Sequence, residues 1–114
     1  MMVYVVVLSF IGFDILTGFL KAFYKEGINS TVLRKGLFHK LSEIVAVAGA
    51  ALFEYGSTYV NLNIDIPLVA CVSTYICIME TISILENLSE VNPGLGKLFK
   101  PYLEKMKDKE EESE

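Results

Sequence analysis

The sequence predicts an all-α integral membrane protein with three transmembrane helices, an outside N-terminus and a cytoplasmic C-terminus that ends in a short charged tail. Three apolar blocks alternate with polar connectors along the 114 residues. Hydrophobic residues make up 53% of the chain and the mean hydropathy is +0.46, which argues against a soluble domain. We expect one membrane domain over 1–114, with spans at about 2–20, 41–60 and 66–88 and a cytoplasmic tail at 89–114.

The first predicted span, 2–20, reads MVYVVVLSFIGFDILTGFL, and Asp14 is its only formal charge. At ~1.5 Å per residue, a helix of this length approaches the ~30 Å thickness of the hydrocarbon core. A cleaved secretory leader would begin with basic residues and end at small ones. No Lys or Arg precedes Lys21, and KAFYK follows the apolar run, so a retained span is the favoured interpretation.

The second and third predicted spans are less clear from hydropathy alone. The block 41–60 contains Glu43 and Glu54, while the block 66–88 has Pro67 near its start and Glu80 and Glu86 in its second half. Their uncharged cores are shorter than the ~18 residues of a typical span, so buried helices of a soluble bundle would look similar.

The distribution of basic residues separates these two possibilities. Every Lys and Arg lies in the connector 21–40 or after residue 88, and none lies at the N-terminus or in the connector 61–65. This asymmetry predicts three spans with the N-terminus outside and the C-terminus inside. It also leads us to expect that the carboxylates within the spans have no cationic partner in the membrane. The tail is predicted to form a short amphipathic segment followed by disorder.

Each predicted span carries one polar or small face. Asp14, Thr17 and Gly18 share a face of the first helix because they lie at i, i+3 and i+4. Small residues such as Ala46 and Ala50 recur every four positions in the second, a spacing that allows close helix approach. A polar face of the third helix contains Ser73, Cys77, Glu80, Ser83 and Asn87.

From the residues alone, two roles for these faces stay open. They can pack against one another within a monomer, or they can line water inside an oligomer, since a charge in a bilayer tends to face a bundle interior or water. We expect Glu54 at the outer interface and Glu43 at the inner interface beside Lys40.

Other chemistries are poorly supported by the sequence. His39 is the single histidine and has no second ligand at metal-binding spacing. Cys71 and Cys77 lie six residues apart in one apolar block, so we expect reduced thiols that serve packing. No phosphate-binding loop or nucleophile site is evident. The prediction is a non-enzyme without cofactor or metal, which contacts membrane lipid and binds no nucleic acid.

Three ordered motifs carry a resemblance to a known family. DILTG in the first span, STVLRKGLFHK before the second and METISILENL in the third resemble the phage holin family of three-span holins that includes clostridial toxin-secretion and phage-lysis holins. The match runs from about Val3 to Tyr102 and so covers nearly the whole chain.

The resemblance implies a homo-oligomer that forms pores in the bacterial cytoplasmic membrane and releases an endolysin, or a toxin without a signal peptide. The alternative is a small non-pore adaptor or antiholin-type regulator that binds another membrane protein. The candidate pore-lining or helix-interface residues are Asp14, Thr17, Gly18, Ala46, Ala50, Ser73, Glu80, Ser83, Glu86 and Asn87.

Overall fold

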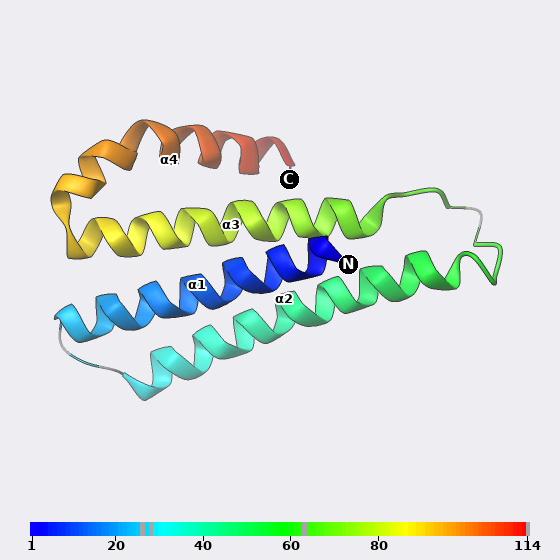
Figure 1. Ribbon diagram of the computed structural model, residues 1–114, viewed down its shortest axis with the longest axis horizontal. Helices are drawn as coiled ribbons and strands as arrows, with labels where there is room; N and C mark the ends of the chain where they lie inside the picture. The colour runs from blue at the N-terminus through cyan, green and yellow to red at the C-terminus, as the bar shows by residue number, and fades with distance from the viewer. Residues whose placement is uncertain (26, 28, 63, 114) are drawn as a thin grey trace.

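The computed structural model describes residues 1–25, 27, 29–62 and 64–113, with side chains described as far as Lys109. Its helices follow one another as α1 (Met2–Lys25), α2 (Ser30–Gly56), α3 (Leu68–Val91) and α4 (Pro93–Ser113). They lie roughly along one axis in a flattened molecule of 52 × 32 × 23 Å (Figure 1). The predicted all-α class is therefore confirmed.

Three of these helices, α1 to α3, are long and apolar enough to cross a membrane. They contain 24, 27 and 24 residues, which at ~1.5 Å per residue exceeds the ~30 Å hydrocarbon core. The prediction of three membrane-spanning helices is confirmed, but α2 begins well before residue 41. It begins at Ser30 because the Asn29 side chain caps it, accepting hydrogen bonds from the Thr31 and Val32 amides at 2.9 and 3.3 Å.

Helix α3 organises the molecule, since α1, α2 and α4 each pack against it. Figure 1 shows α1 and α4 on its two sides. The small apolar core brings together Val7 and Ile11 of α1, Val47 of α2 and Ile76 of α3. Most other large apolar side chains are exposed, Leu16 and Leu52 among them. A soluble monomer rarely exposes so much apolar surface, whereas a bilayer would cover it.

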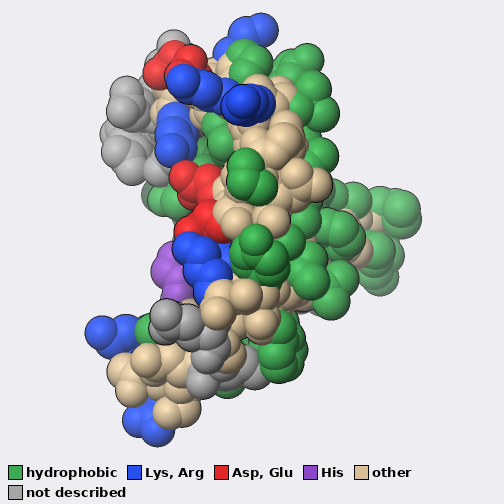
Figure 2. Space-filling model, turned by 90° about the vertical axis from the view of Figure 1, so that its left-hand side faces the viewer, with side chains coloured by type: hydrophobic (Ala, Val, Ile, Leu, Met, Phe, Trp, Pro, Cys, Tyr) green, Lys and Arg blue, Asp and Glu red, His purple; other side chains and the backbone are tan. Residues whose placement is uncertain are grey.

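One end of the bundle is rich in cations, and we call it the basic end. Here α1 ends, α2 begins and α3 ends, and Figure 2, which views the molecule from this side, shows Lys and Arg side chains spread over it. Glu90 of α3 accepts from Lys25 at 2.6 Å and pairs with Lys21 at 3.0 Å. These ion pairs join the ends of α1 and α3.

The C-terminal segment differs from the sequence prediction of a short amphipathic piece and disorder, because it forms the helix α4. Pro93 occupies the first helical position, where its missing N–H costs nothing, and the Asn92 side chain accepts from the Gly94 amide at 3.1 Å. Pro101 lies inside α4 without ending it. The helix runs back along α3 and packs through a half-buried row that we call the α4 stripe: Leu95, Phe99, Leu103 and Met106.

Candidate functional site

A carboxylate lies near the middle of each membrane-capable helix, and these three groups form the centre of the candidate site. Asp14 is midway along α1, Glu43 midway along α2 and Glu80 midway along α3. The residues are 6%, 8% and 1% exposed, so all three are buried between the helices. Glu43 therefore lies midway along α2 rather than near its end, where the inner membrane interface is predicted, and it is beside Lys40 as predicted.

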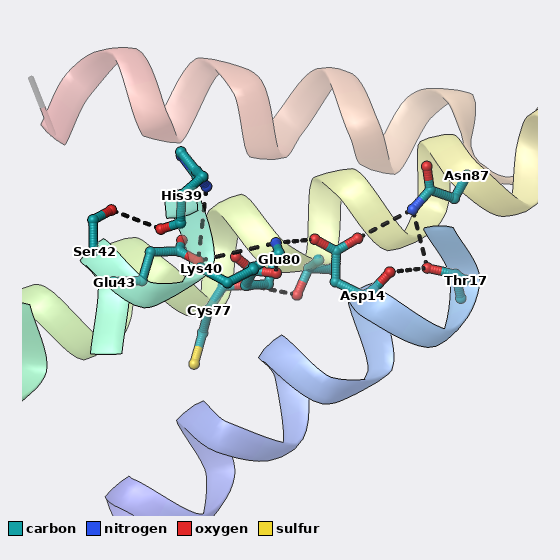
Figure 3. Close-up of polar contacts among 10 residues, drawn as sticks. Asp14, Thr17, His39, Lys40, Ser42, Glu43, Cys77, Glu80 and Asn87 are labelled. Carbon is teal, nitrogen blue, oxygen red and sulfur yellow. Dashed lines mark hydrogen bonds and ion pairs between the residues drawn. The ribbon is translucent and has the colours of Figure 1, made fainter. Parts of the chain in front are cut away.

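Lys40 of α2 is the cation at the centre of this layer. Its ammonium group donates to an Asp14 carboxylate oxygen and, at 2.5 Å, to Glu80 (Figure 3). A Glu43 oxygen lies 3.9 Å from the same nitrogen. We refer to Asp14, Lys40, Glu43 and Glu80 as the charged layer. The expectation that these carboxylates lack a cationic partner is wrong, because Lys40 reaches the middle of α1 and α3 from α2.

The charged layer has more acid than base. One ammonium group faces three carboxyl groups, and the Glu43 Oε1 atom is buried without a hydrogen-bond partner among the described residues. His39, largely exposed, comes within 3.9 Å of that oxygen. An ionised carboxylate in an apolar interior is stable only when its lone pairs are satisfied. The layer therefore needs hydrogen-bond donors beyond Lys40, which water would supply.

A second set of hydrogen bonds extends the layer toward the basic end. The Asn87 amide donates at 3.1 Å to both Asp14 and the Thr17 hydroxyl, and Thr17 donates at 3.0 Å to the backbone carbonyl of Asp14 (Figure 3). Gly18 faces the same amide, since a Cβ there would meet it at 3.9 Å. The Asp-x-x-Thr-Gly motif of α1 thus meets Asn87 of α3, although about seventy residues separate them.

A groove between α1 and α2 leads to this layer. The groove holds about 410 Å³ and is lined by Asp14 and Lys40 at its inner side and by Ser83 and Asn87 of α3. Gly18 and Gly36 also line it and keep it open, because neither has a side chain to fill the space. The charged layer is buried, but it is not sealed.

The remaining predicted residues are placed differently. Ser73 is buried with its hydroxyl unpartnered among the described residues. Glu86 is exposed and pairs at 3.1 Å with Lys107 of α4, so it lies outside the charged layer. Ala50 packs in the interface with α3, whereas Ala46 is exposed. The buried face of α2 is Glu43, Val47 and Ala50, which shares Ala50 with the predicted small-residue face but has Val47 in place of Ala46.

Two functional contacts escaped sequence reasoning. Lys40 lies in the predicted connector 21–40, and its spacing from the apolar block carries no signal of a partner in α1. The carboxylate of Glu54, a residue that we expect at the outer interface, accepts the Val69 amide at 2.6 Å and so caps α3. Pro67 supplies no side-chain cap, which leaves the first amides of α3 in need of an acceptor. The sequence signal for this contact is a predicted helix that begins directly after a proline and therefore needs an acceptor from elsewhere in the chain.

Comparison with known proteins gives one informative result. The model of the bacteriophage holin family matches residues 1–108, nearly the entire chain. No curated protein and no solved structure matches the chain.

Proposed function

The chain belongs to the bacteriophage holin family, and from this premise we propose that it assembles into homo-oligomers that open lesions in the bacterial cytoplasmic membrane. Family membership and three membrane-capable helices make it a multi-pass protein of that membrane. The proposed cargo is an endolysin, which would bring about cytolysis, or a toxin that lacks a signal peptide. Residues 1–114 would act as one holin domain.

The observation that carries this proposal is the charged layer at the middle of α1, α2 and α3. A charged residue at the centre of a membrane helix costs ~2.5 to 3.5 kcal/mol on insertion scales. Lys40 offsets part of that cost for Asp14 and Glu80, but a third buried carboxyl group, on Glu43, shares the same ammonium. Hydration of the layer would remove the remaining penalty. Assembly around a water-filled interior supplies that hydration, which a closed monomer in lipid does not.

The proposed orientation places the basic end in the cytoplasm. Lys21, Lys25, Arg34 and Lys35 belong to this end, in keeping with the excess of cations in cytoplasmic loops. The opposite end carries Asp65 in the α2–α3 connector. The N-terminus would then lie outside and α4 would follow α3 on the cytoplasmic side.

Induced expression in a bacterial cell tests the proposed function. Membrane potential is followed with a voltage-sensitive dye, and release of a cytoplasmic reporter protein is measured in the same culture. We expect the potential to collapse and the reporter to appear outside. Stable insertion with unchanged potential would contradict pore formation and favour the antiholin-type regulator. For substitutions of acids in the charged layer, Asp65→Asn provides a matched acid-to-amide control, because Asp65 is exposed and remote from the layer.

A further inference from the structure

Helix α4 lies against α3 in a position that a bilayer would not permit. Met106 of α4 lines a cavity of about 330 Å³ together with Val3 and Val7 of α1 and Cys77 of α3. Cys77 precedes the end of α3 at Val91 by fourteen residues, which corresponds to about 21 Å along the helix. Met106 thus packs deep along a helix that crosses the membrane.

The neighbours of Met106 are charged and exposed. Glu104, Lys105 and Lys107 surround it in the sequence and are exposed on α4. With α3 in a bilayer, this part of α4 would present those charges to hydrocarbon, where Lys107 keeps its ion pair with Glu86 at 3.1 Å but Glu104 and Lys105 have no water. The α4 stripe must therefore find another apolar surface when α1 to α3 are inserted.

The covering of α4 by α3 is also incomplete. At 100° per residue, Leu98 and Tyr102 adjoin the α4 stripe and widen it into a single apolar arc. These two residues are 60% and 57% exposed beside α3. A planar lipid surface would cover the whole arc, whereas the one helix α3 covers only part of it.

The charges around the arc fit an anionic surface. On the helical wheel, Lys100 and Lys105 lie at its two edges, from which their long side chains can reach lipid phosphates. Glu104 lies on the opposite side of the helix, away from such a surface. No acidic residue occurs between Pro93 and Leu103, so the first half of α4 is purely basic.

The short connection between α3 and α4 places the start of α4 at the level of the membrane surface. Asn92, in an extended conformation, is the single residue between the end of α3 at Val91 and the start of α4 at Pro93. Helix α4 therefore starts where α3 leaves the membrane. A change at this short joint is enough to turn α4 from α3 onto the surface.

We propose that α4 docks on the anionic headgroup surface at the basic end and inserts the arc formed by the α4 stripe, Leu98 and Tyr102 into the headgroup–acyl boundary. This docking requires that α3 spans the membrane, but it does not require pore formation. The position beside α3 belongs to conditions in which that face of α3 is in water.

Reconstitution of the full-length protein tests this docking. The protein is inserted into phosphatidylcholine vesicles with or without phosphatidylglycerol, and insertion is verified by flotation. An environment-sensitive fluorophore is attached to Leu103→Cys in a background of Cys71→Ser and Cys77→Ser. We expect blue-shifted emission and protection from an aqueous quencher, stronger in the vesicles with phosphatidylglycerol. The matched control Glu104→Cys, one residue along, stays accessible to the quencher.

A crosslink reports the competing position. With Cys71→Ser and Met106→Cys, the native Cys77 is the available partner, and we expect little Cys77 disulfide in phosphatidylglycerol vesicles. Efficient crosslinking there overturns the proposal, as does equal quenching of the Leu103→Cys and Glu104→Cys labels. Equal protection in both vesicle types overturns the assignment to an anionic surface. Dye leakage from the same vesicles reports pore formation separately, so the two proposals fail independently.

Discussion

Replacing Lys40 by methionine removes the cation of the charged layer and keeps a side chain of similar length. Asp14 and Glu80, 6% and 1% exposed, then lose the ammonium that both of them contact. Removing one partner of a buried ion pair typically costs 3–5 kcal/mol. At ~1.4 kcal/mol per tenfold change, the closed arrangement would become less favourable by roughly two to three and a half orders of magnitude relative to a hydrated one.

We therefore expect Lys40→Met to permeabilise the membrane earlier than the parent chain at the same membrane level. The assay is the time from induction to loss of membrane potential, with protein levels matched by immunoblot. Lys25→Met is the control, because Lys25 forms an exposed pair with Glu90 that is worth ~0–1 kcal/mol. Delayed or unchanged timing for Lys40→Met would refute the reasoning, since it would mean that the carboxyl groups are neutral in the closed protein.

The other predictions concern the acids, the cap, the topology and the tail. Asp14→Leu should insert readily but abolish permeabilisation, whereas Asp14→Asn should retain part of it with altered timing in the voltage-dye assay; parental behaviour of Asp14→Leu would remove Asp14 from the pore. Glu54→Ala should lower thermal stability in detergent by ~1 kcal/mol, since it removes the acceptor at the start of α3, and an unchanged melting curve would contradict that capping role. In cells, a thiol reagent that does not cross membranes should label Asp65→Cys and spare Lys35→Cys; the reverse pattern would invert the proposed orientation. Deletion of 108–114 should leave insertion intact and change only lesion timing, and loss of the protein from the membrane fraction would show that this segment is structural.

The sequence by itself determined the fold class and the number of membrane-capable helices. Both depend on local properties, namely the length of the apolar blocks and the turn signals between them. The Asn29 cap and Gly27, with a φ of 93°, are readable in the same way because their roles involve near neighbours in the chain. The motif containing Asp14 also pointed to the α1 face that the structure buries.

Only the tertiary structure decided which groups meet. Hydropathy predicts Lys40 in a connector because its charge ends the apolar block. In the structure α2 begins at Ser30, so Lys40 lies within this helix and its side chain reaches the middle of α1 and α3. Its partners are 26 and 40 residues away in the chain. No local sequence pattern predicts these long-range contacts, because they depend on the position of α2 along the axis of α3. The partial match of the α2 face, with Ala50 buried and Ala46 exposed, has the same origin: periodicity defines the faces of a helix, while packing selects the one that is buried.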